Sequence, residues 1–121
     1  MCRITEESMS TEDFDQQMKL YDDLTKECER IFLTFYTEIA NAYIEYCRTK
    51  GSYRKYKAFE MTTGSDCVNV VNEVRDNFEQ RGIRKDFALL AYNEARSKAT
   101  LSVISNIKTR LSDVLCEVID N

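Results

Sequence analysis

The chain has 121 residues, of which 43% are hydrophobic and 31% charged, with no proline and three glycines. This length suits one domain with one core, and the composition is typical of a helical protein rather than a disordered chain. The formal net charge of −4 argues against a protein that coats nucleic acid over its whole surface, because phosphate binding needs concentrated Lys and Arg.

The first predicted element is a very long helix over about residues 11–50. Ser10 is its expected N-cap, and Asp13, at the third helical position, suits the positive end of the helix dipole. Neither glycine nor proline interrupts the helix before Gly51. Residues 1–9, which precede the cap, are expected to form a flexible tail.

Apolar residues recur along this helix at alternating spacings of four and three, the heptad pattern of a helix that packs on a partner. The series comprises Phe14, Met18, Tyr21, Thr25, Cys28, Phe32, Phe35, Ile39, Ala42 and Tyr46. A helix of this length measures about 58 Å at 1.5 Å per residue, whereas a compact chain of this size has a radius of gyration of only about 14 Å. We therefore predict an elongated protein that self-associates, first of all as a dimer. The expected oligomer seam is Phe14, Met18, Tyr21, Cys28 and Phe32.

The segment after Gly51 is harder to assign. Residues 52–61 fit either a short helix or an extended piece, because their aromatic side chains suit both. Residues 62–65, Thr-Thr-Gly-Ser, are predicted to form a turn, followed by a medium helix over about 66–81. The expected buried face of that helix is Val68, Val71, Val74 and Phe78, and Gly82 is placed to end it in a left-handed conformation.

A second long helix is predicted over about residues 85–119. Its expected buried stripe comprises Phe87, Leu90, Leu101, Ile104, Leu111, Leu115 and Val118, and a ridge of small residues is formed by Ala91, Ala95 and Ala99. Such a ridge allows two helices to approach closely. The predicted fold class is therefore all-α, an elongated three- or four-helix bundle in a single domain spanning residues 1–121.

The sequence lacks the usual signs of catalysis. It has no histidine, which removes the commonest general base and the usual transition-metal ligand. Its glycines stand singly rather than in a phosphate-binding loop, and its five cysteines form no Cys-x-x-Cys pair. Nearby carboxylates such as Glu38 and Glu45 have no counterpart in the second long helix, as a di-metal bundle site would require. We predict no enzyme activity, no catalytic or metal-binding residues, and no cofactor.

One segment departs from the acidic background. Residues 46–59 hold five basic residues, no acidic ones and four aromatic ones. Basic side chains interleaved with aromatic rings are typical of surfaces that bind single-stranded nucleic acid. The candidate contact residues are Arg48, Lys50, Tyr53, Arg54, Lys55, Tyr56 and Lys57. The alternative is structural: cations are favoured at the end of a helix, and the tyrosines can be half-buried packing residues.

The function predicted first is a non-enzymatic helical protein-interaction module, an adaptor or inhibitor that binds a protein partner and forms a homo-oligomer. The acidic stretch over residues 6–23 supports this prediction, because a chain acidic at one end and basic further along can associate through complementary surfaces. The alternative is a nucleic-acid-binding protein that uses segment 46–59. No stretch approaches the roughly 20 apolar residues of a membrane span, and the N-terminus lacks a signal peptide's apolar core. We therefore expect no membrane contact and an intracellular location, cytoplasmic or nuclear.

Overall fold

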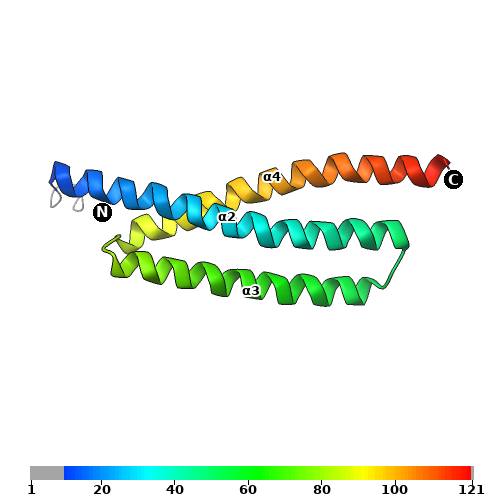
Figure 1. The fold of residues 1–121 in the computed structure, drawn as a ribbon, viewed down its shortest axis with the longest axis horizontal. Coiled ribbons are helices and arrows are strands. Elements are labelled where there is room, and N and C mark those ends of the chain that lie inside the picture. The colour runs from blue at the N-terminus through cyan, green and yellow to red at the C-terminus, as the bar shows by residue number, and fades with distance from the viewer. Residues whose placement is uncertain (1–9, 121) are drawn as a thin grey trace.

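The computed structural model describes residues 10–120, with side chains to residue 114. Three helices occupy this range: α2 (Thr11–Thr49), α3 (Tyr53–Gln80) and α4 (Lys85–Asp120). Figure 1 shows them as an elongated bundle in which α2 and α3 form a long hairpin and α4 crosses α2. The predicted all-α fold with two long helices and a shorter one is confirmed. The tail expected over residues 1–9 lies outside the described residues.

Helix α2 begins and ends close to the predicted positions. The Ser10 side chain accepts a hydrogen bond from the backbone N–H of Asp13 at 3.1 Å, so one of the free donors at the helix start is satisfied. At the other end Lys50 adopts a left-handed conformation, with φ of 54°. This conformation ends the helix and turns the chain back toward α3.

Helix α3 corrects the prediction for residues 52–81. It begins at Tyr53, with Ser52 as N-cap, and continues without a break through Gly64 to Gln80. The turn predicted at residues 62–65 is therefore wrong, and the separate helix predicted over 66–81 is the C-terminal part of one 28-residue helix. A single glycine inside a helix costs only about 1 kcal/mol. Burial of Thr63 and Cys67 against the bundle on either side of Gly64 offsets that cost.

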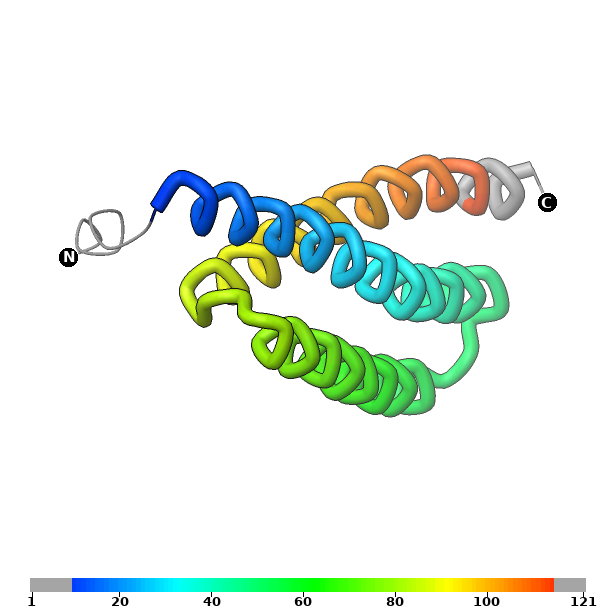
Figure 2. The backbone as a smooth tube through the Cα atoms, turned by 60° about the vertical axis from the view of Figure 1, so that its left-hand side comes forward, coloured from blue at the N-terminus to red at the C-terminus, as the bar shows by residue number. Residues whose placement is uncertain are grey.

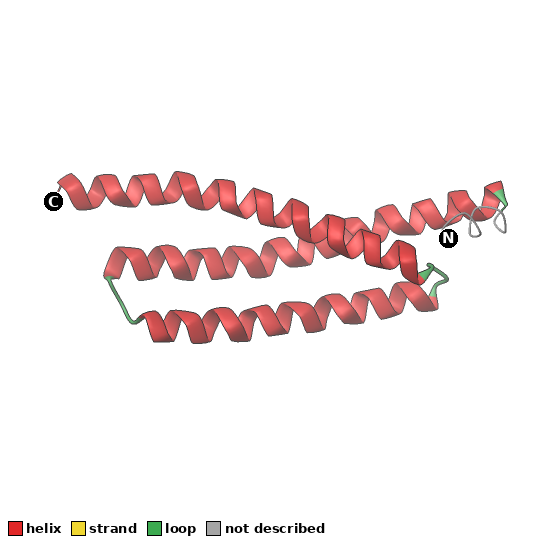
Figure 3. Cartoon of the chain, turned by 180° about the vertical axis from the view of Figure 1, so that it is seen from behind, coloured by secondary structure: helices red, strands yellow, loops and turns green. Residues whose placement is uncertain are grey.

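The link between α3 and α4 is short and is held by α2. Gly82 has a φ of 110°, the left-handed conformation predicted for it. The Gln17 side chain of α2 donates to the Gly82 carbonyl at 2.8 Å, and it accepts from the Arg84 backbone N–H at 3.0 Å. Both polar ends of one amide thus fix this loop, which is drawn in green in Figure 3.

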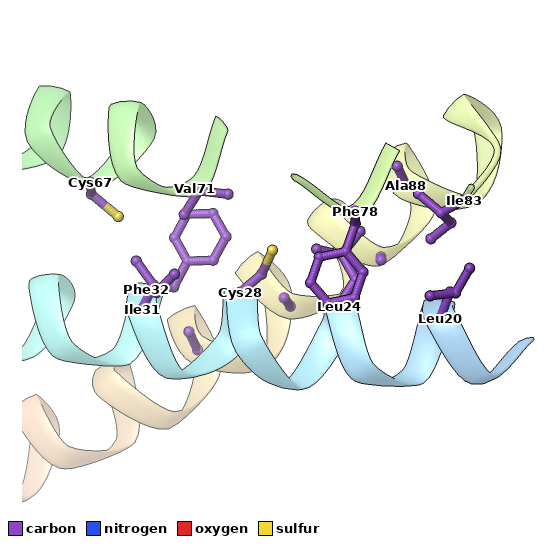
Figure 4. Packing of buried hydrophobic residues seen from close by; sticks show 13 residues of the cluster. Leu20, Leu24, Cys28, Ile31, Phe32, Cys67, Val71, Phe78, Ile83 and Ala88 are labelled. Carbon is purple, nitrogen blue, oxygen red and sulfur yellow. The ribbon is translucent and has the colours of Figure 1, made fainter. Parts of the chain in front are cut away.

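The core lies along the middle of α2. Figure 4 shows Leu24, Cys28 and Phe32 of α2 facing Val71 and Phe78 of α3. All five side chains are buried. Within α3, Cys67 takes a core position that the sequence analysis gave to its neighbour Val68, whose side chain is 41% exposed.

Helix α4 packs on α2 through small residues. Ala88, Ala91, Ala95 and Ala99 are all completely buried, so the predicted alanine ridge is confirmed. Three members of the stripe of large residues predicted to be buried are instead exposed: Leu90, Leu101 and Ile104 are 55%, 69% and 43% exposed. Phe87 and Leu111 are half-buried, and the side chains of Leu115 and Val118 lie outside the described residues. Only one side of α4 can face α2. The alanines take that side because they allow the two backbones to approach closely.

Helices α3 and α4 lie together only near the loop that joins them. Figures 1 and 2 both show α4 leaving α3 along its length, with α2 between the two at the end where the α2–α3 hairpin closes. We call residues 30–72 and 95–114 the hairpin half of the molecule. In that half, the side of the bundle between α3 and α4 is open.

Candidate interaction surface

A groove opens where α4 leaves α3. It has a volume of about 450 Å³ and is lined mainly by apolar and aromatic side chains from all three helices. The lining residues are Tyr36, Ile39, Ala40 and Tyr43 of α2, Tyr56 and Glu60 of α3, and Thr100, Val103, Ile104 and Ile107 of α4. Its apolar walls can take up two or three apolar side chains of another molecule, which is how amphipathic helices bind grooves.

Glu60 is the charged residue of the groove wall. It accepts a hydrogen bond from the Lys57 ammonium at 2.6 Å and a longer one from the Tyr56 hydroxyl at 3.4 Å. The hydrogen bond to Glu60 raises the pKa of Lys57. Burial, followed by the Glu60 charge, raises the pKa of Tyr56. The charge of the Glu60 carboxylate is thus balanced by Lys57 of the same helix, and the groove presents little unpaired negative charge.

The four tyrosines next to the groove pack on one another. Tyr43 and Tyr46 come from the end of α2, and Tyr53 and Tyr56 from the start of α3. The Tyr46 and Tyr56 rings are stacked, with centroids 5.9 Å apart and planes 20° apart, and the Tyr43 and Tyr56 rings lie 5.5 Å apart. These contacts tie the two helices of the hairpin together. Tyr53 also contacts the Tyr46 and Tyr56 rings, at 5.8 and 6.2 Å between centroids, but 56% of its surface is exposed.

The predicted basic residues fall into two groups. Arg48 forms an ion pair with Glu45 at 3.6 Å, and Lys57 forms one with Glu60 at 2.6 Å. Lys50, Arg54 and Lys55 are exposed and have no ion pair with another described residue. The structure therefore brings the predicted segment together at one tip of the molecule, but it uses the aromatic rings for packing.

The two halves of the molecule carry opposite charge. The hairpin half holds ten basic and five acidic residues, a net charge of +5. The remaining described part, residues 11–29 and 73–94, holds six basic and twelve acidic residues, a net charge of −6. The acidic start and the basic segment 46–59 were predicted from the sequence. The contribution of α4 was not predicted, although its residues 95–112 include four basic side chains and no acidic one.

The predicted oligomer seam on α2 is largely occupied by the chain itself. Cys28 and Phe32 are fully buried in the core, and the Tyr21 hydroxyl donates a short hydrogen bond to Glu94 of α4. Met18 is half-buried, and Phe14, near the start of α2, is 46% exposed. Most of the exposed large apolar side chains therefore belong to α3 and α4 rather than to α2.

The described residues hold no group of three or more His, Cys, Asp or Glu side chains with the geometry of a metal site. Burial raises the pKa of the Cys28 and Cys67 thiols to about 11, which keeps both protonated and unreactive near neutral pH. None of the described helices combines the length and the apolar character needed to cross a bilayer.

Comparisons with known proteins add no assignment. No family model matches the chain, and no curated protein and no solved structure shows a significant match.

Proposed function

We propose that the protein is a non-enzymatic interaction module whose groove binds an amphipathic helix of a partner protein, with acidic residues flanking the helix's apolar face. The observation that supports this proposal most is the apolar groove between α2, α3 and α4. It lies in the half of the molecule that carries a net charge of +5. An apolar groove in a positively charged part of the surface is complementary to a helix that has an apolar face flanked by acidic residues.

Burial of apolar side chains should contribute more to the affinity than ion pairs with the surrounding cations. Burying one Leu or Ile side chain contributes about 1.5–3 kcal/mol, and the groove has room for two or three such side chains. The exposed cations Lys50, Arg54 and Lys55 contribute less to affinity, because ion pairs in solvent are worth about 0–1 kcal/mol each. Their main effect is on association rate and on the choice between acidic and basic partners.

The test uses two designed helical peptides with the same Leu and Ile face, one flanked by Glu and the other by Lys. Fluorescence anisotropy should show that the Glu-flanked peptide binds and that the Lys-flanked peptide binds at least tenfold more weakly. Equal affinity for both peptides, or no binding of either, would overturn the proposal.

A substitution in the groove distinguishes binding at this site from nonspecific hydrophobic binding elsewhere on the surface. Ile107→Gln removes an apolar wall without adding charge, and it should weaken binding of the Glu-flanked peptide at least tenfold. Leu89→Gln is the matched control, because Leu89 is an exposed apolar residue of α4 outside the groove. Circular dichroism checks that both variants remain helical. If both substitutions weaken binding equally, the groove is not the binding site.

A second candidate function is the binding of single-stranded nucleic acid at the hairpin tip. It rests on Lys50, Arg54 and Lys55, which are exposed without an ion pair to another described residue, next to the exposed ring of Tyr53. Phosphate contacts by three cations predict weak binding that falls steeply with salt. Because the other three tyrosines pack on each other, stacking on bases can involve one ring at most.

The test for this candidate is the binding of a 20-nucleotide oligo-uridine at several salt concentrations. Replacing Lys50, Arg54 and Lys55 with Gln should abolish binding. Replacing Lys19, Lys26 and Lys85, exposed cations outside the hairpin half, should leave it unchanged. No binding at low salt, or equal loss in both triple variants, would rule this candidate out.

A further inference from the structure

Two arginines from different helices contact one tyrosine ring. The ring of Tyr92 on α4 has its centroid 5.0 Å from the guanidinium carbon of Arg75 on α3. It lies 5.7 Å from that of Arg96, one turn further along α4. Aromatic faces attract cations, so the ring favours both guanidinium positions. Two positive charges therefore lie close together between α3 and α4, near the place where these helices separate in Figures 1 and 2.

Neither arginine forms an ion pair with another residue in the part of the chain that the structure describes. Arg75 is half-buried, and its Nε atom is shielded from solvent and has no hydrogen-bond partner. A shielded guanidinium N–H without an acceptor costs free energy, and so does a cation removed from water without a counter-charge. An anion held by the two side chains would offset part of the cost of keeping Arg75 half-buried.

The arginine pair lies at the end of the groove that is nearer the α3–α4 loop. Tyr36 lines the groove; burial raises its pKa, and the nearby charge of Arg96 acts in the opposite direction. Arg96 also precedes Thr100, another lining residue, by one helical turn. Burial likewise raises the pKa of Cys28, and the Arg75 charge opposes that effect, so the Arg75 side chain lies against the core. The apolar groove is thus continued by two cations.

We propose that Arg75 and Arg96 together bind one oxyanion, a carboxylate or phosphate group, beside the Tyr92 ring. A guanidinium group donates parallel hydrogen bonds to two oxygens of either kind of group, and such charge-assisted bonds are stronger than those between neutral partners. Half-burial strengthens the attraction, because solvent screens it less than it screens the exposed cations at the hairpin tip. The site consists of the arginine pair and does not depend on the proposed function of the groove.

Inorganic phosphate is the probe, and the side-chain Nε–H signal of Arg75 in the ¹⁵N-labelled protein is the readout. At constant ionic strength, phosphate added to about 20 mM should shift this signal with a saturable dependence on concentration. Arg96→Gln should weaken phosphate binding at least tenfold, because one of the two guanidinium groups is lost. Arg96 is exposed, so this change does not threaten the fold.

Arg81→Gln is the matched control. Arg81 is also an exposed arginine over an aromatic ring, with its guanidinium carbon 4.2 Å from the Phe78 centroid, but it is not part of the pair on Tyr92. Its replacement should leave phosphate binding at Arg75 unchanged. The absence of a saturable shift in the wild type, an unchanged affinity in Arg96→Gln, or an equal loss in both variants would overturn the proposal.

The Glu-flanked helical peptide then identifies the source of the oxyanion. If the bound helix supplies the carboxylate, saturating peptide should shift the Arg75 signal and block its response to phosphate. If the peptide binds and phosphate still shifts the signal with unchanged affinity, the site takes a free anion. The phosphate titration contains no peptide, so failure of the groove to bind a helix and failure of the arginine pair to bind an oxyanion are distinguishable.

Discussion

Ala99 and Leu101 stand two residues apart on α4 but face opposite sides of the helix: Ala99 is completely buried, and Leu101 is 69% exposed. The small residue packs inside the chain, and the large one faces solvent. This arrangement reverses the usual distribution of side-chain size between core and surface. The side of α4 opposite the alanine ridge therefore leaves a large apolar side chain in solvent.

The alanine ridge sets how closely α2 and α4 approach. Replacing Ala95 with Leu should lower the free energy of unfolding by about 1–3 kcal/mol, because the larger side chain has no space to enter. Urea denaturation followed by circular dichroism measures the change. Ser105→Leu is the control: Ser105 is exposed on the same helix, so its replacement should change stability by less than about 0.5 kcal/mol. Equal effects of the two substitutions would mean that the ridge is not tightly packed.

Two glycines should respond in opposite ways to alanine. Gly64 lies inside α3, and a methyl group added there meets no atom within 4 Å, so Gly64→Ala should stabilise the protein by about 0.5–1 kcal/mol. Gly82 has a φ of 110°, which strains any L side chain, so Gly82→Ala should destabilise it by about 1 kcal/mol or more. The melting temperature should therefore rise in Gly64→Ala and fall in Gly82→Ala. A destabilising Gly64→Ala would contradict the continuous helix α3.

Alkaline pH should weaken the fold through its buried thiols. The pKa of Cys28 and that of Cys67 are raised from 9.0 to about 11 by burial, so folding favours the protonated form. The stabilisation is complete below pH 9 and is lost as the pH rises toward 11. Between pH 8 and pH 10.5, the titration of each thiol should lower the free energy of unfolding by about 2 kcal/mol. Urea unfolding curves at the two pH values measure the loss.

The control for this pH effect is Cys28→Ala. The variant starts from a lower stability because it creates a cavity. Between pH 8 and pH 10.5, however, it should lose about 2 kcal/mol less than the wild type, because one of the two titrating thiols is absent. If the loss is the same in both proteins, Cys28 does not carry the predicted pKa shift.

The sequence predicted the helix ends best where one residue's chemistry decides them. Ser10 is a cap because its side chain accepts the Asp13 N–H, and Gly82 ends α3 because glycine tolerates a positive φ. The turn predicted at residues 62–65 was wrong. The local sequence favours a turn there, but burial of the residues on either side favours a continuous helix. The positions of Thr63 and Cys67 in the core could not be known before the helices were placed together.

The candidate site was predictable only in part. The basic segment 46–59 was visible in the sequence, and it does gather at one tip of the molecule. The groove beside it depends on how far α4 leaves α3, a property of tertiary packing. In α4 the heptad stripe and the alanine ridge are both regular, and the sequence alone did not show which of them faces α2. The alanine ridge faces α2 because its small side chains allow the two helices to pack closely.

Chemical-shift mapping tests most directly whether the groove is an interaction site. The Glu-flanked helical peptide is titrated into the ¹⁵N-labelled protein, and backbone amide shifts are followed. We expect the largest changes at Ile39, Tyr56, Val103 and Ile107, which line the groove on three different helices. No shift change at saturating peptide, or changes confined to the acidic half around Asp22, would contradict it.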